Sequence, residues 1–301
     1  MIGKWLGAAT LACAMAASPA AAQDKVRLVA TFSILADFAR NVGGDKVEVS
    51  ELVGPDSDAH VYAPSPADAK RLAEARLVLV NGLGFEGWLD RLVKASGTKA
   101  AVAVTTAGIK PRRMQEAGDG HGHSHGRSDP HAWQSVANAK VYVANIRDAL
   151  VKADPAGQAA YEANAAAYAS KLDALEAEVK ATIAAIPAER RKIITTHDAF
   201  GYFAAAYGVS FIAPQGVSTE AEVAARDLAK IIRQVKAQKI PAVFMENVTD
   251  PRLMKRIAEE TGAKIGGRLY SDALSAKDGP AASYIEMMRH NLKELRGALM
   301  S

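Results

Sequence analysis

Four potential metal ligands lie far apart in the sequence, and each stands where a predicted strand ends in a loop. They are His60, His131, His197 and Asp272. Three neutral imidazoles and one carboxylate satisfy a borderline divalent cation such as Zn²⁺ with four short bonds, which leaves no demand for a reactive water. Together the four residues predict one site that holds a metal ion without using it in a reaction.

The elements that must position these residues alternate between strand and helix in both halves of the chain. In the first half, the hydrophobic pattern predicts strands over 26–33, 47–53, 77–81 and 100–104, and helices over 34–42, 66–75 and 85–95. In the second half, it predicts strands over 192–196, 209–212, 242–245 and 264–266, and helices over 199–207, 220–238, 251–261 and 280–299. This alternation indicates parallel sheets, whose strand ends face a common crevice, so we expect the four ligands to converge.

Two further helices are predicted between the halves, over 135–152 and 155–186. The second would be about 45 Å long at 1.5 Å per residue and would act as a stiff strut. The predicted fold class is therefore α/β, with two lobes that each hold a parallel sheet flanked by helices, one long rigid helix joining them, and the metal site in the cleft between the lobes. The predicted divisions are a signal peptide (1–22), an N-terminal lobe (23–134), linking helices (135–189) and a C-terminal lobe (190–301).

The first residues have the layout of a cleaved secretory signal. Lys4 precedes an apolar stretch over 5–17, and Ala20-Ala21-Ala22 supplies the small residues of a cleavage site. The only cysteine, Cys13, lies inside this segment, so the mature chain would have neither disulfides nor thiolate ligands. Lipid attachment at Cys13 is the weaker alternative, because the preceding residues lack the usual leucine. Export to the periplasm is predicted.

The charge of the chain argues against a nucleic-acid partner. Its 37 basic and 33 acidic residues give a net charge of +4 and form no dense basic block. A surface that follows a phosphate backbone needs clustered lysine and arginine. We therefore expect no nucleic-acid binding, and we expect a monomer.

A histidine-rich segment lies between the first two candidate ligands. Residues 116–128 are rich in glycine and carry His121, His123 and His125 at every second position. Such a flexible tract can collect zinc weakly and pass it inward. The alternative is a surface insertion without a role.

Other residues near the ligands are weaker candidates. Asp58, Asp129 and Asp198 could each accept the second N–H of a ligand imidazole, or could instead cap turns. Six aromatic residues could wall the site from water, although any one of them could be ordinary core: Tyr62, Phe85, Trp133, Phe200, Tyr202 and Tyr270. The sequence assigns no role to Arg226 or Glu246.

Five segments carry a resemblance to a known family. They are GPDSDAHVYAP (54–64), NGLGFE (81–86), DPHAW (129–133), TTHDAFGYFAAAYG (195–208) and SDALS (271–275). In this order and over nearly the whole mature chain, they resemble the zinc/manganese-type (cluster A-I) solute-binding proteins of ABC importers. The resemblance implies that His60 and His131 come from the N-terminal lobe and His197 and Asp272 from the C-terminal lobe.

The resemblance also implies a function and its partners. It implies a periplasmic receptor that delivers Zn²⁺ to an ABC permease in the inner membrane, with a periplasmic metallochaperone as a further candidate partner. Family members that prefer manganese usually have glutamate at the position of His197, and imidazole nitrogen suits Zn²⁺ better than Mn²⁺. Zinc is therefore expected, with Mn²⁺ as the alternative. Asp272 is the ligand that another carboxylate or a water replaces in some zinc-type relatives.

Two other classes of protein are weaker alternatives. A zinc hydrolase needs an open coordination position and a general base beside the bound water. The chain has no H-E-x-x-H helix, and no glutamate adjoins a candidate ligand in the expected manner. A metal-dependent adhesin would leave no motif that separates it from a receptor. We therefore expect that the protein is not an enzyme.

Overall fold

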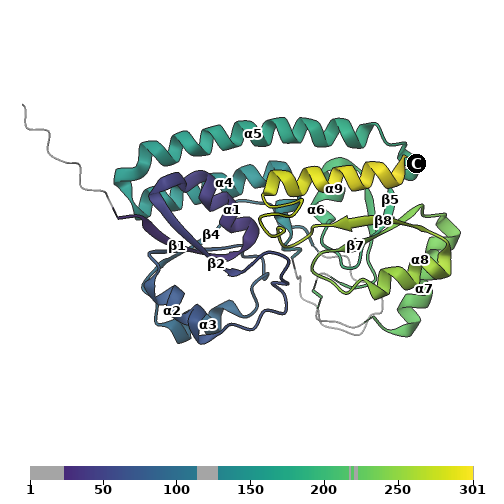
Figure 1. Cartoon of the computed structure of the whole chain (residues 1–301), viewed down its shortest axis with the longest axis horizontal. Helices are drawn as coiled ribbons and strands as arrows, with labels where there is room; N and C mark the ends of the chain where they lie inside the picture. Colours follow the sequence, from purple (N-terminus) through teal and green to yellow (C-terminus); the bar gives the residue numbers. More distant parts are fainter. Residues whose placement is uncertain (1–23, 114–127, 217, 220–222, 301) are drawn as a thin grey trace, which may run out of the picture.

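Two parallel four-stranded sheets lie side by side in the computed structural model, one in each half of Figure 1. The structure describes residues 24–113, 128–216, 218–219 and 223–300. The predicted signal peptide (1–22) and the histidines His121, His123 and His125 lie outside the described residues. Within the described part, no helix is long and apolar enough to cross a membrane.

The N-terminal lobe is built on a sheet of order β2-β1-β3-β4. Its strands are β1 (Val26–Phe32), β2 (Val47–Val53), β3 (Leu77–Val80) and β4 (Ala101–Val104), and its helices are α1 (Ser33–Gly43), α2 (Pro66–Glu74) and α3 (Leu89–Ser96). Helices cover both faces of the sheet, so β1 and β3 are almost continuously apolar and buried.

The C-terminal lobe repeats this topology with the order β6-β5-β7-β8. Its strands are β5 (Lys192–Ile194), β6 (Ser210–Ile212), β7 (Ala242–Glu246) and β8 (Lys264–Leu269), and its helices are α6 (Gly201–Tyr207), α7 (Ala225–Gln238), α8 (Arg252–Thr261) and α9 (Tyr284–Leu299). In both lobes the first strand is paired on both sides. β1 pairs with β2 and β3, and β5 pairs with β6 and β7, so each is an internal strand of its sheet.

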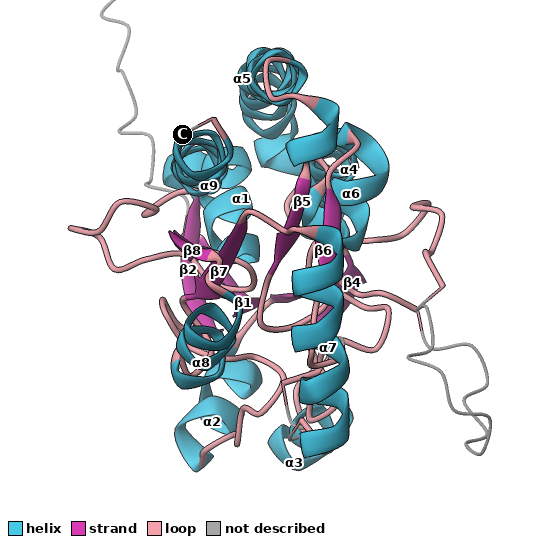
Figure 2. Cartoon of the chain, turned by 90° about the vertical axis from the view of Figure 1, so that its right-hand side faces the viewer, coloured by secondary structure: helices cyan, strands magenta, loops and turns pink. Residues whose placement is uncertain are grey.

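One layer of helices covers both lobes. Helix α4 (Val136–Ala153) is followed by α5 (Gln158–Ala184), whose 27 residues extend over both lobes along the top of Figure 1. This length corresponds to about 40 Å. Figure 2 shows α5, α4 and α9 above the sheets, and α2, α3, α7 and α8 below them. The predicted two-lobed α/β class with a long connecting helix is confirmed.

The apolar core is continuous between the lobes on the α5 side. Phe38 of α1 packs against Tyr168 of α5 and Tyr284 of α9, with ring centroids 6.2 and 4.8 Å apart. These rings belong to one cluster of buried side chains that reaches both sheets. A smaller cluster lies on the opposite face of the C-terminal sheet, where Val243 packs with Ile232 of α7 and its neighbours. The lobes are thus joined by packing as well as by chain.

Several predicted helices begin later than expected. The helices predicted over 155–186, 199–207 and 220–238 begin at Gln158, Gly201 and Ala225. Two other late starts have a clear local cause. The helix predicted over 85–95 starts at Leu89, because Gly82, Leu83 and Gly84 have positive φ and turn the chain before it can become helical. The helix predicted over 280–299 starts at Tyr284, since the Ser283 hydroxyl caps it by accepting from Glu286 N–H. Both differences lie outside the strands that carry the candidate ligands.

The Tyr284 hydroxyl makes a buried hydrogen bond between the lobes, and removal of this hydroxyl is expected to destabilise the fold. It donates to the backbone carbonyl of Trp133 at 2.6 Å. Tyr284→Phe leaves that carbonyl unsatisfied, so we expect the free energy of unfolding to fall by about 1–2 kcal/mol. Urea denaturation would measure the change. The control is Tyr270→Phe, because the Tyr270 hydroxyl has no hydrogen bond within the described part of the chain and its loss should have little effect.

Candidate metal centre

The four predicted ligands meet at the interface between the lobes. One nitrogen or oxygen atom from each lies within 4.8 Å of those of the others, and we call this group the His₃Asp cluster: His60, His131, His197 and Asp272. His60 Nε2 lies 3.2 Å from His131 Nε2 and 3.2 Å from Asp272 Oδ2. His197 Nε2 lies 3.0 Å from Asp272 Oδ2. Three of the residues are fully buried, and the side chain of His60 is 6% exposed.

His60 is carried by the loop that follows β2. The indole N–H of Trp88 donates to the Ala59 carbonyl at 2.8 Å, which fixes the backbone just before the ligand. The backbone N–H of His60 donates to Asp58 Oδ1 at 2.8 Å. After His60 in the chain, the Asp68 carboxylate accepts from the Tyr62 hydroxyl and from the backbone N–H and the hydroxyl of Ser65. The imidazole therefore projects from a loop that is anchored on both sides.

His131 is held through the segment that precedes it. The Asn81 side chain, at the end of β3, donates to the Pro130 carbonyl at 2.9 Å. Asp129 Oδ1 then accepts from the backbone N–H and the Nδ1–H of His131, at 3.0 and 2.9 Å. With Nδ1 occupied by the carboxylate, Nε2 is the nitrogen that faces the cluster.

His197 and Asp272 come from the C-terminal lobe. His197 follows β5, and its Nδ1 lies 2.6 Å from Oε2 of Glu246, the last residue of β7. The other oxygen of Glu246 accepts from the backbone N–H groups of Thr196 and His197, at 2.7 and 2.9 Å. Asp272 is fixed from the opposite lobe, because the indole N–H of Trp133 donates to the neighbouring Ser271 carbonyl at 2.9 Å.

Of the three aspartates that the sequence offers as partners of the imidazoles, one contacts a ring nitrogen. Asp129 contacts a ligand ring as predicted. Asp58 follows the alternative interpretation, a residue that caps a turn, since its oxygens accept from the His60 backbone and from Thr219 Oγ1. No described contact joins the Asp198 carboxylate to an imidazole N–H. Glu246 takes that role at His197, and the sequence gives no direct sign of it except that Glu246 ends β7, which pairs with β5.

Burial and the neighbouring charges shift the pKa values of the cluster in opposite directions. Burial disfavours a charged imidazole, but the carboxylates of Asp272 and Asp129 outweigh it and raise the pKa of His131 to about 9. Glu246 and Asp272 likewise raise the pKa of His197 well above its usual value despite its burial. Burial alone would raise the pKa of Asp272, yet the two imidazoles lower it well below its usual range. A proton and a metal ion therefore compete for the same nitrogens.

Two of the six predicted aromatic residues contact the ligand rings. Phe85 packs 4.9 Å from His60, and Trp133 packs 5.3 Å from His131, measured between ring centroids. The other four have different partners. For example, Tyr62 packs on Trp88, and Tyr270 packs on His290. Phe85 and Trp133 form an apolar wall on the N-terminal side, which limits the access of water and would strengthen the bonds to a metal ion held there.

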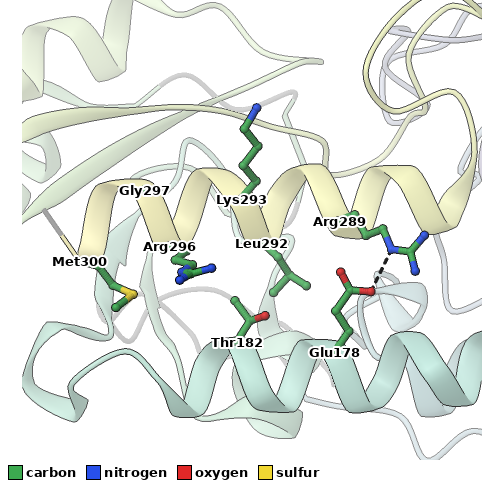
Figure 3. A pocket seen from close by; sticks show the side chains of 8 residues that line it. All are labelled: Glu178, Thr182, Arg289, Leu292, Lys293, Arg296, Gly297 and Met300. Carbon is green, nitrogen blue, oxygen red and sulfur yellow. Dashed lines mark hydrogen bonds and ion pairs between the residues drawn. The ribbon is translucent and has the colours of Figure 1, made fainter.

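A surface groove of about 560 Å³ lies elsewhere, between α5 and α9. Figure 3 shows its lining, in which Arg289 of α9 pairs with Glu178 of α5 at 2.9 Å. No member of the His₃Asp cluster lines this groove. Arg226, to which the sequence assigned no role, pairs with its neighbour Asp227 on α7, away from the cluster.

The donor set suits a divalent transition metal. The cluster offers three imidazole nitrogens and a carboxylate, and Oδ1 of Asp272 is a buried oxygen without a hydrogen-bond partner in the described ranges. A cation at the centre would satisfy that oxygen. Carboxylates at the Nδ1 side of His131 and His197 fix each ring with Nε2 inward and increase its basicity. The arrangement can hold a metal ion with four protein ligands.

Comparison with known proteins identifies the family. The family model described as "Zinc-uptake complex component A periplasmic" matches residues 28–298. The iron-binding protein YfeA of Yersinia pestis is 36% identical over 90% of this chain and 85% of its own length. The manganese ABC transporter substrate-binding lipoprotein PsaA of Streptococcus pneumoniae is 32% identical over 96% of this chain and 94% of its own length.

Solved structures agree with this match. The periplasmic zinc binding protein TroA of Treponema pallidum superposes with a TM-score of 0.83 at 29% identity, covering 91% of this chain and 99% of its own. A manganese-bound periplasmic metal binding protein from Candidatus Liberibacter asiaticus gives 0.81 at 31% identity, covering 91% of this chain and 100% of its own. Proteins of this family are metal-binding receptors of ABC importers and not enzymes. This chain belongs to that family, the zinc-uptake component A (ZnuA) family of periplasmic metal-binding proteins.

Proposed function

We propose that the protein binds Zn²⁺ in the His₃Asp cluster and delivers it to an ABC permease in the inner membrane. The carrying observation is the convergence of three imidazoles and one carboxylate, from both lobes, within 4.8 Å of one another. Four protein ligands complete the coordination of Zn²⁺, which fits a cargo that is held and later released. The metal is the substrate of transport in this proposal.

The choice of zinc rests on the donor atoms. Three nitrogens and one carboxylate suit Zn²⁺, whereas Mn²⁺ prefers oxygen-rich sites with more ligands. The alternative is a manganese receptor of the same type, and it is favoured by the manganese name of the relative PsaA and by the manganese-bound structure of the similar protein from Candidatus Liberibacter asiaticus. Because the relative YfeA is named an iron-binding protein, Fe²⁺ is a third cation to be tested.

Metal competition would test the proposal. The mature protein is dialysed against Zn²⁺, Mn²⁺ and Fe²⁺ buffered by chelators, and metal bound to protein from the native periplasm is measured. We expect about one tightly bound Zn²⁺ per chain and much weaker Mn²⁺ binding. Tight manganese with manganese in the native protein would select the alternative. No tight binding of any of the three ions would remove the receptor proposal.

Several other parts of the proposal extend beyond the cluster. We propose removal of residues 1–22 on export to the periplasm, a monomeric receptor, and the division at residues 134/135 and 189/190 into lobes and linking helices. The accessory role of His121, His123 and His125 in collecting metal, and loading by a periplasmic metallochaperone, are also proposals. Zinc binding by a chain without residues 116–128 would test the first of these two roles.

Metal affinity is expected to fall as the pH falls, beginning near pH 9. A bound imidazole must be neutral, and the pKa of His131 is about 9, so a proton competes at neutral pH. The ordinary imidazole value of about 6.5 would place this competition lower. Affinity should therefore rise by about tenfold per pH unit for each proton released. Chelator competition at several pH values would measure the slope.

The stability of the metal-free protein should change in the opposite direction. The pKa of His131 is higher in the folded than in the unfolded chain, so its proton stabilises the fold fully below about pH 6.5. That contribution is lost as the pH rises through about 9. Thermal unfolding of metal-free protein at the same pH values is the companion measurement. A zinc affinity that does not change with pH would contradict the prediction that protons compete with the metal.

A further inference from the structure

Asp129 links a candidate ligand to the opposite lobe. Its Oδ1 holds both N–H groups of His131, and its Oδ2 lies 3.7 Å from Nε of Arg112. The carboxylate is almost completely buried, with 4% of the residue exposed. The contact at 3.7 Å is an ion pair without a hydrogen bond, and a positive charge beside the second oxygen stabilises the buried carboxylate.

Arg112 is itself fixed by the C-terminal lobe. Its guanidinium lies over the ring of Tyr202, on α6, at 5.7 Å from the ring centroid. Its backbone N–H donates to the Tyr202 hydroxyl at 3.0 Å, and its carbonyl accepts from Asp129 N–H at 2.9 Å. Both the backbone and the side chain of Arg112 therefore depend on a tyrosine from the other lobe.

Gly201 allows this close approach between the lobes. A Cβ atom at Gly201 would lie 2.5 Å from Asp129 Oδ2 and 3.1 Å from Arg112 Nε. Real Cβ atoms do not approach an oxygen so closely, so the first residue of α6 must be a glycine for the pair to keep its position. The contact consists of Asp129 and Arg112 on one side and Gly201 and Tyr202 on the other.

We propose that Arg112 is a positioning residue for the metal site and acts through Asp129 on His131. The guanidinium, held between Tyr202 and the outer oxygen of Asp129, keeps the carboxylate turned towards the imidazole. Without it, the outer oxygen is a buried charge without a partner, and rotation towards solvent takes Oδ1 away from the ring. The affinity of the site therefore depends on the packing of α6 against the N-terminal lobe. This inference rests on the proposed function.

Charge-matched substitutions at adjacent arginines test the inference. Arg112→Gln is expected to weaken zinc binding by about tenfold, the lower end of the range for residues that orient a metal ligand. Arg113→Gln removes the same charge from the neighbouring, exposed position and is expected to leave affinity unchanged. Arg112→Lys keeps a positive charge near Asp129 and should recover most of the loss. Chelator competition on the mature chain gives the affinities, and the visible spectrum of bound Co²⁺ reports the ligand geometry.

A double-mutant cycle separates a positioning role from a purely structural one. If Arg112 acts through Asp129, then Arg112→Gln should cause no further loss in an Asp129→Asn background. Gly201→Ala keeps every charge but displaces the same pair, so it should also weaken zinc binding and change the Co²⁺ spectrum.

Three results would overturn the inference. They are equal affinities for Arg112→Gln and Arg113→Gln, additive losses in the double-mutant cycle, and wild-type zinc binding by Gly201→Ala. Failure of the proposed function is distinguishable, because the wild-type protein would then bind no metal tightly in the same titration. Thermal unfolding of each metal-free variant establishes that it is folded at the temperature of the titration.

Discussion

His131→Ala is expected to weaken zinc binding by a factor on the order of 10² to 10³. Structural zinc sites with four ligands provide about 10–16 kcal/mol, so that one ligand accounts for roughly 2.5–4 kcal/mol. His131 is fully buried at the centre of the cluster, and its removal also leaves Asp129 without its imidazole partner. Competition with a chelator of known affinity would measure the change.

The matched control for this variant is His290→Ala. His290 lies on α9, where its Nε2 is 3.0 Å from the Arg268 carbonyl, and it is not part of the His₃Asp cluster. We expect zinc affinity in the control to equal that of the wild type. If His131→Ala binds zinc as tightly as the control does, the assignment of the cluster as the metal site is wrong.

Glu246→Gln is expected to weaken zinc binding by about 10- to 100-fold, as is usual when the partner of a metal-bound histidine is removed. The amide can still accept from the backbone N–H groups of Thr196 and His197, as Oε1 of Glu246 does. It no longer presents a carboxylate to Nδ1 of His197, which lies 2.6 Å from Oε2. The ring then loses basicity and its fixed orientation. Zinc titration of the variant is the measurement.

An exposed glutamate provides the control for Glu246→Gln. Glu259→Gln makes the same chemical change on the surface of α8 and is expected to leave zinc affinity unchanged. The variants should also differ in pH dependence, because only Glu246 contacts a ligand. Equal affinities for the two variants would show that the carboxylate at His197 has no role in metal binding.

Most of the fold could be predicted from hydrophobic periodicity, because strands buried on both faces differ clearly from amphipathic helices. The errors fall at helix starts, where local turn chemistry decides. Phe85 lies in a turn because three preceding residues have positive φ, a conformation that an apolar pattern does not encode. Tyr284 begins a helix because Ser283 caps it. Such boundaries depend on the backbone conformation of a turn or on a single capping hydrogen bond, which periodicity does not resolve.

The convergence of the candidate ligands could be predicted, but their partners could be predicted only in part. His60, His197 and Asp272 lie in loops that follow β2, β5 and β8, and parallel strands end at one edge of a sheet, so their positions in the sequence indicate their positions in space. His131 does not directly follow a strand, since β4 ends at Val104. Asp129 was found because it is two residues from His131. Glu246 is 49 residues from His197 and reaches it through the pairing of β5 with β7. Sequence proximity alone does not separate Asp129 from Asp58, whose carboxylate accepts from the His60 backbone.

The continuous core beneath α5 makes the two lobes inseparable as folding units. Phe38, Tyr168 and Tyr284 come from three parts of the chain and pack in one cluster. A fragment that ended before α5 would expose the apolar side of α1 to water, and a fragment that began after α5 would expose that of α9. The polypeptide must therefore be synthesised almost to its end before this side of either lobe can reach its native state. Premature termination before α9 yields an incomplete fragment and not a smaller functional protein.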